Sequence, residues 1–153
     1  MYEKEVDLVT GSIDIRRMLN QCSTDFKLVD VSYRCPTEEW LIDVAGEAYQ
    51  QTAFDHGLRV YHRDDWDIDD RAMLYCATAR GVHRKELWQP SCGLAVGLAT
   101  YCVMGNPRNS RAICWAIANR LGQAVVVFID PGDVPELMKL TEKELASLRS
   151  FYI

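Results

Sequence analysis

The chain has 153 residues, of which 48% are hydrophobic and 25% are charged, and its formal net charge is −5. This length predicts a single domain, residues 1–153, and the composition is that of a globular protein rather than a disordered or fibrous one. The acidic balance argues against nucleic acid as a partner, because nucleic-acid binding needs a basic surface.

Membranes and an oxidising compartment are also disfavoured. No run approaches the roughly 18 consecutive apolar residues that a membrane-spanning helix needs, and the first residues lack the apolar core of a signal peptide. None of the six cysteines forms a CxxC pair, so we expect reduced thiols and a cytoplasmic location. They are Cys22, Cys35, Cys76, Cys92, Cys102 and Cys114.

The first half of the chain alternates predicted helices and strands. Ser12 can cap a helix over residues 13–21, and residues 26–33 are expected to form a strand. Thr37 can cap a second helix, for which Gly57 is a natural end.

The middle of the chain continues this alternation. A short strand is expected at residues 58–62 and a helix at 71–79, with an acidic turn between them. The aspartates of that turn lack the EF-hand pattern, so we interpret them as a solvated turn and predict no metal site. They are Asp64, Asp65, Asp67, Asp69 and Asp70.

The second half carries the strongest patterns. Residues 94–104 and 124–129 are apolar on both faces, which is typical of central strands in a parallel sheet. Residues 112–121 place their apolar side chains on one helical stripe that Gly122 would end. A last helix is expected at residues 141–148, which begin with the spacing of a capping box.

This order of elements predicts the α/β class, with a mainly parallel sheet built from βαβ units. In particular, strands 94–104 and 124–129 should be parallel neighbours joined by a helix over residues 110–121. The alternative is an α+β ferredoxin-like sandwich, since two βαβ-like halves also fit it.

The polar turn before residues 112–121 is the candidate ligand site. Free amides at a helix start together with two arginines are suited to hold an anion. Asp130 follows the next strand and is included in the site. The full set of candidate ligand-binding residues is Gly105, Asn106, Arg108, Asn109, Ser110, Arg111 and Asp130. The alternative is that the turn only caps the helix and that its arginines are solvated or pair with Asp130 and Asp133.

Two residues are candidates for catalysis. Cys35 precedes a predicted helix start, a setting that lowers the pKa of a thiol. His62 ends a predicted strand at the same sheet edge and could act as an acid or base. No third group that would orient this pair is identified, and no motif assigns the chain to a family.

The sequence therefore supports two hypotheses. The first is a protein that binds a small anionic ligand, a nucleotide or phosphorylated metabolite, at the carboxyl edge of the sheet, where transfer or hydrolytic chemistry could take place. The second is a non-catalytic interaction or assembly protein, with a protein partner or a second copy of the chain as its ligand. No motif names a cofactor, which stays unknown.

Overall fold

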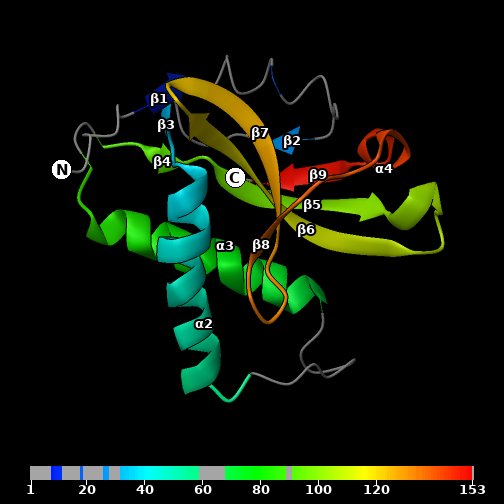
Figure 1. Ribbon diagram of the computed structural model, residues 1–153, viewed down its shortest axis with the longest axis horizontal. Helices are drawn as coiled ribbons and strands as arrows, with labels where there is room; N and C mark the ends of the chain where they lie inside the picture. The colour runs from blue at the N-terminus through cyan, green and yellow to red at the C-terminus, as the bar shows by residue number, and fades with distance from the viewer. Residues whose placement is uncertain are drawn as a thin grey trace.

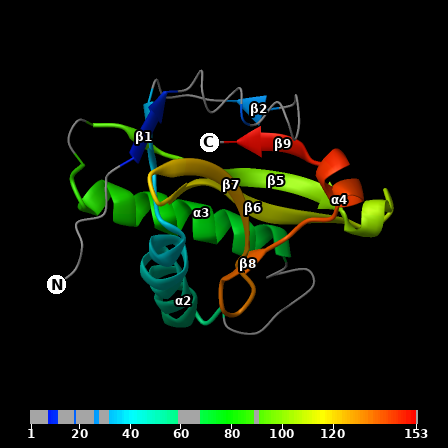
Figure 2. The same ribbon diagram turned by 45° about the horizontal axis from the view of Figure 1, so that its top comes forward.

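The computed structural model describes residues 8–11, 18, 26–27, 32–58, 68–88 and 91–152. Its sheets and helices form layers, with the main sheet on one side and two crossing helices on the other (Figures 1 and 2). Outside the described residues lie Cys22, the acidic turn up to Asp67, and most of the predicted helix 13–21 and strand 58–62.

The main sheet has six strands in the order β2-β9-β5-β6-β7-β8. Their bounds are β2 Phe26–Lys27, β5 Val96–Cys102, β6 Ser110–Arg120, β7 Gln123–Asp130, β8 Glu136–Met138 and β9 Arg149–Tyr152. Strands β5 to β8 pair with their neighbours antiparallel, as does β9 with β5, and only the short β2 runs parallel to β9. A second, three-stranded sheet consists of β1 Leu8–Gly11, β3 Ser32–Cys35 and β4 Gly93–Leu94 in the order β1-β3-β4.

The predicted parallel α/β sheet is therefore wrong. Residues 110–120 form the strand β6 rather than a helix, and β6 pairs antiparallel with both β5 and β7. The stripe of Ile113, Ala116 and Ile117 fits helical spacing, but residues 113–119 are all buried. A strand covered on both faces has no period-two alternation, so its pattern resembles that of a buried helix. The ferredoxin-like alternative is also wrong, because β5, β6 and β7 follow one another as hairpins without intervening helices.

The turn between β6 and β7 is the reason that these strands are antiparallel. Leu121 and Gly122 both have positive φ, +53° and +83°, which is the backbone of a two-residue type I′ hairpin. The Asn119 side chain accepts a hydrogen bond from the Gly122 amide at 2.8 Å and closes the turn. Gly122 thus ends β6 by reversing the chain, not by ending a helix.

The helices follow the sequence signals closely. Thr37 Oγ1 accepts from the Trp40 amide at 3.1 Å, ahead of a π-helical turn, η1 Trp40–Val44, and helix α2 Ala45–Asp55, and Gly57 follows with φ +68°. Helix α3 Ile68–Lys85 covers the predicted helix 71–79. Helix α4 Glu142–Ala146 begins with the predicted capping box of Thr141 and Glu144. The three helices are confirmed, although α3 continues past its expected end at residue 79 and α4 ends two residues before residue 148.

Each face of the main sheet has its own core. One face packs against α2 and α3 through Leu41, Tyr75, Cys76, Cys114 and Ile129. The opposite face carries Tyr101, Ile113, Trp115 and Phe128, and Tyr33 of β3 belongs to the same core. Burying one such side chain stabilises the fold by about 1.5–3 kcal/mol, so β6, which contributes to both cores, is central to the fold.

A cluster that we call the arginine clasp joins β3 to the end of α3. The buried Arg34 guanidinium lies 4.6 Å from the Trp40 ring and 4.1 Å from the Trp88 ring. Its Nη1 is 2.5 Å from Glu86 Oε2, and Glu86 also accepts from Trp40 Nε1 at 2.8 Å. Burial raises the pKa of Glu86, but the hydrogen bonds from Trp40, Arg34 and Trp88 outweigh it and leave the pKa below its ordinary value. His83 lies beside Arg34 and contacts the Cys92 carbonyl oxygen at 2.9 Å.

Candidate functional site

The site is built around the end of β7 and the loop that follows it, residues 130–134. Three side chains from the helices hold it. Tyr49 donates to the Gly132 carbonyl at 2.7 Å, and Gln50 donates to the Asp133 carbonyl at 3.3 Å. Arg71, at the start of α3, forms an ion pair with Asp133 at 3.1 Å. Because two helices fix this loop, the hollows on either side of it have defined walls.

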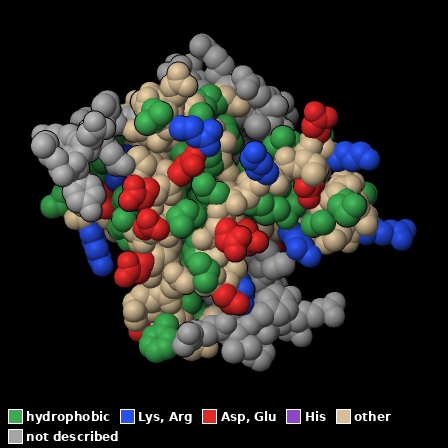
Figure 3. Space-filling model, viewed as in Figure 1, with side chains coloured by type: hydrophobic (Ala, Val, Ile, Leu, Met, Phe, Trp, Pro, Cys, Tyr) green, Lys and Arg blue, Asp and Glu red, His purple; other side chains and the backbone are tan. Residues whose placement is uncertain are grey.

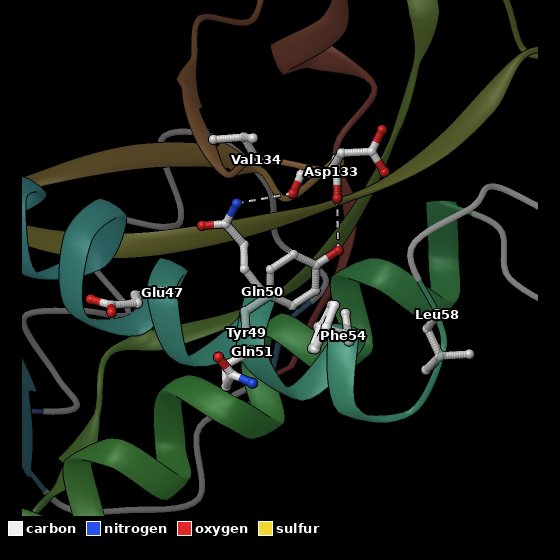
Figure 4. Close-up of a pocket in the computed structure, with 10 residues that line it drawn as sticks. Glu47, Tyr49, Gln50, Gln51, Phe54, Leu58, Asp133 and Val134 are labelled. Atoms are coloured by element: carbon white, nitrogen blue, oxygen red, sulfur yellow. Dashed lines mark hydrogen bonds between the residues drawn. The ribbon is translucent and has the colours of Figure 1, made fainter.

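The first hollow, which we call the α2 cleft, lies between α2 and the loop and has a volume of about 510 Å³. Its lining mixes one exposed aromatic ring with amides and carboxylates, as Figure 4 shows. Phe54 is 55% exposed, and the side chains of Glu47, Gln50, Gln51 and Asp133 supply donors and acceptors. The remaining lining residues are Tyr49, Ala53, Leu58, Gly132 and Val134.

The second hollow, the sheet-end cavity, has a volume of about 160 Å³ and lies where β6 begins and β7 ends. Tyr101 and Arg111 are direct cross-strand partners in the β5–β6 pair. Asp130, at the end of β7, lines the same cavity together with the buried Arg71. Gly132 lines both the sheet-end cavity and the α2 cleft.

Both tyrosines of the site are neutral donors near pH 7. Burial raises the pKa of Tyr49 to about 12, while Arg71 lowers it and Asp133 raises it. Burial likewise raises the pKa of Tyr101, against the opposing effect of Arg111. Their hydroxyl groups therefore keep their protons over the physiological range.

The two arginines of the site are matched by two aspartates, and Glu47 adds a further negative charge. Arg71 is paired with Asp133, and Arg111 shares its cavity with Asp130. In the view of Figure 3, acidic side chains also gather over the α2 side of the molecule. The site thus has no surplus of positive charge with which to attract an anion.

The predicted ligand residues divide into two groups. Arg111 and Asp130 are brought together in the sheet-end cavity. Ser110 begins β6, and the others lie in the connection between β5 and β6, which contains the short 3₁₀ turn η2 Val103–Gly105. These others are Gly105, Asn106, Arg108 and Asn109. Asn106 accepts there from the Arg108 amide at 3.0 Å. Because a strand and not a helix follows this connection, the helix N-terminus on which the predicted anion site depended is absent.

The two predicted catalytic residues cannot be compared as a pair. Cys35 is 3% exposed and lies in β3, within the core on the face of the sheet away from α2 and α3. His62 lies outside the described residues. A catalytic role for Cys35 and His62 therefore stays a prediction.

The sequence analysis missed the residues of the α2 cleft. The predicted helix that ends at Gly57 contains Phe54, Gln50 and Gln51. From the sequence, these three residues have the character of ordinary surface positions on a helix. An exposed phenylalanine close to a helix end was the one available signal. Tyr101 belongs to an apolar strand, so its sequence position does not mark it as a site residue. The register of the β5–β6 pair places it beside Arg111.

Other classes of site find little support among the described residues. They contain no group of three or more His, Cys, Asp or Glu side chains placed to hold a metal ion. None of the helices within them is long and apolar enough to cross a membrane. The five cysteines that they include are free thiols, and burial raises the pKa of the Cys114 thiol.

Comparison with known proteins gives a likeness in fold. No protein-family model matches the chain, and no curated protein sequence does. Among solved structures, one described as a PSL1a-E64 complex is similar with a TM-score of 0.68 and 17% identity, over 95% of this chain and 51% of that chain. Another is the Polyporus squamosus lectin bound to the epitope Neu5Acα2-6Galβ1-4GlcNAc, with a TM-score of 0.66 and 16% identity, over 95% of this chain and 50% of the lectin.

At these identities the likeness shows the fold alone, and the chain spans about half the length of each matched structure. It nevertheless corrects one function that the sequence suggested. The nucleotide-binding hypothesis depended on a ligand at the carboxyl edge of a parallel sheet, and the chain instead has a mainly antiparallel sheet in a fold similar to half of a lectin chain.

Proposed function

We propose that this chain is a saccharide-binding domain and that the α2 cleft is its binding site. The observation that carries the proposal is the exposed Phe54 ring beside the amide and carboxylate groups of Gln50, Gln51 and Glu47. A sugar ring has an apolar face of C–H groups and a rim of hydroxyls, each of which both donates and accepts. An aromatic ring covers the first, and glutamine and glutamate side chains match the second.

The size of the cleft supports this proposal. Binding sites for small molecules typically have volumes of about 300–1,000 Å³, and they combine apolar surface with a few convergent polar groups. The cleft, at about 510 Å³, lies within that range. Its rim carries Glu47 and Asp133 but no lysine or arginine among its lining residues, which favours a neutral sugar over an acidic one.

The likeness to the lectin gives independent support. The Polyporus squamosus lectin is described as bound to a trisaccharide epitope. The chain matches only half of that lectin, so its own saccharide need not be the same one. The cleft residues, and not the epitope, define what this chain would recognise.

The first experiment is a glycan array probed with the full chain, followed by calorimetric titration of each glycan that it binds. Phe54→Ala should weaken binding about five- to tenfold, because a half-exposed ring would contribute roughly 1–1.5 kcal/mol when a sugar covers it. Met73→Ala is the matched control, since Met73 is 54% exposed on α3 and lines neither hollow. Absence of binding to any glycan, or unaltered affinity in Phe54→Ala, would contradict the proposal.

A further inference from the structure

We propose that the outer edge of β7 is a docking site for an extended peptide, which would add to the main sheet as a further antiparallel strand. The peptide would carry apolar side chains at alternate positions and an acidic residue at its N-terminal end. The groove beside this edge shares no lining residue with the α2 cleft, so peptide docking is independent of saccharide binding.

The outer edge of β7 is only partly covered by β8. Strand β6 pairs with β7 along residues 123–129, whereas β8 pairs only with residues 128–130. After Met138 the chain leaves the sheet and runs on to α4 (Figure 2). Among the described residues, no strand therefore pairs with the outer side of residues 123–127.

The backbone groups of Ala124 and Val126 point outward along this edge. Their partners across the β6–β7 pair are Asn119 and Ile117. The amides of these partners point away from β7, because they donate to carbonyl oxygens on the other side of β6 at 2.8 and 3.0 Å. Opposite residues of an antiparallel pair either bond to each other or both turn outward. Ala124 and Val126 thus offer two N–H donors and two carbonyl acceptors that have no hydrogen-bond partner in the described part of the chain.

An apolar groove runs beside this edge and gives room for the side chains of a peptide. It has a volume of about 520 Å³, and seven of its ten lining residues are apolar, which favours apolar side chains. Val126 and Val127 both line it, although consecutive side chains of a strand point to opposite faces, so the groove follows the edge of the strand. A peptide residue paired with Val126 would place its side chain on the face that carries Leu140 and Leu145.

The charges and the length of the open edge define the peptide further. At the hairpin end of the groove, Arg120 is paired with Glu38. At the other end, directly after β8, the exposed Lys139 has no ion pair among the described residues. A carboxylate on the peptide would pair with Lys139, and the open stretch of residues 123–127 accommodates about five residues of extended chain.

The test uses the acetylated and amidated peptide Asp-Val-Thr-Val-Ser, added to the full chain and followed by NMR and amide hydrogen exchange. In the free chain, the amides of Ala124 and Val126 should exchange faster than those of Val125 and Val127, which point at β6. Bound peptide should slow the exchange of the first two about tenfold. Methylation of the two valine amides of the peptide keeps its side chains but removes the donors that face β7, and it should weaken binding about tenfold.

Two sets of variants test the two ends of the edge. Lys139→Glu should weaken binding about fivefold, and a peptide that begins with Lys in place of Asp should restore it. Lys143→Glu is the matched control, because Lys143 is exposed on α4 and does not line the groove. Ala124→Pro removes one outward N–H, which the pairing with β6 does not need, and should weaken binding about tenfold, whereas Ala124→Gly keeps that N–H and should bind normally.

Every other outcome overturns the proposal. Equal binding of the methylated and unmethylated peptides would mean that the peptide does not add as a strand, and this comparison decides the matter even if Ala124→Pro does not fold. Slow exchange of both outward amides without peptide would mean that the edge is already covered, by the chain itself if the protection is independent of protein concentration and by a second copy if it rises with concentration. No binding at millimolar peptide would mean that the edge is only solvated.

Discussion

Removal of Arg34 should destabilise the protein far more than removal of an arginine from a surface ion pair. Arg34 is 7% exposed, is paired with Glu86 and lies between the Trp40 and Trp88 rings. Removing one partner of a fully buried pair costs about 3–5 kcal/mol, and the loss of the ion pair itself is smaller here, because the Glu86 side chain is 33% exposed and keeps contact with water; together with the two ring contacts we still expect a total of about 3–5 kcal/mol. Each of the two cation–π contacts adds up to about 2 kcal/mol when it is desolvated, and these contributions are included in that range.

The assay is urea unfolding followed by tryptophan fluorescence, since Trp40 and Trp88 are themselves part of the clasp. Arg34→Ala should lower the free energy of unfolding by about 3–5 kcal/mol, and it should lower Tm by roughly 6–20 °C for a chain of this size. Arg34→Lys should recover part of the loss, because it keeps the charge but not the flat guanidinium that stacks between two rings.

Arg120 provides the control. Its side chain is 59% exposed and pairs with Glu38, so Arg120→Ala should cost less than about 1 kcal/mol. If Arg34→Ala is no more destabilising than Arg120→Ala, the clasp does not hold β3 to α3, and the reasoning from burial and stacking is refuted.

Three further predictions concern other parts of the fold. Because the pKa of Glu86 is lowered in the folded protein, its contribution to stability is complete above the ordinary value of 4.5 and is lost as the pH falls through the folded-state pKa. Glu86→Gln should therefore make the free energy of unfolding less dependent on pH below about 4.5. The same dependence of unfolding free energy on acidic pH in both proteins would contradict this. Thr141→Ala should cost about 1 kcal/mol in chemical unfolding by removing the cap of α4, whereas an unchanged midpoint would mean that the capping box is dispensable. Leu121→Asn should stabilise the β6–β7 hairpin by about 0.5–1 kcal/mol, because Leu121 is fully exposed at φ +53° and asparagine tolerates that conformation; a lower Tm would argue against the type I′ turn.

The sequence predicted those elements whose signals are local. The capping box of Thr141 and Glu144, the Thr37 cap and the Gly57 end each depend on residues within a few positions of one another. Such contacts form within a single turn of helix, so spacing alone identifies them. The helices that they delimit were therefore found without knowledge of the rest of the chain.

The sheet could not be predicted in the same way. Whether residues 110–120 form a helix or a buried strand depends on what covers both of their faces, which is decided by segments far away in the chain. The Leu121-Gly122 turn also lacks the Asn-Gly or Asp-Gly signature that usually marks a type I′ hairpin. Pairing direction followed from that one turn, so a single missed signal changed the predicted class of the sheet.

Part of the candidate site could be predicted from the sequence. Arg111 and Asp130 were both named as ligand residues, and they do share a cavity. They meet because β6 begins where the antiparallel β7 ends, not because two parallel strands end at one edge. The α2 cleft depends on the docking of the 130–134 loop by Tyr49, Gln50 and Arg71, and no periodicity in the sequence encodes that contact.

The place of β9 in the sheet has a consequence for how the chain folds. Strands β5, β6 and β7 are joined by short turns, so they can pair early at a small cost in loop-closure entropy. Strand β9, at residues 149–152, pairs with β5 across a long stretch of chain. Strand β2, at residues 26–27, pairs with the outer side of β9. Contacts between such distant segments form slowly. We expect the β5–β7 meander to form the folding nucleus, and the pairing of β9 with β2 to complete the sheet last and to open first.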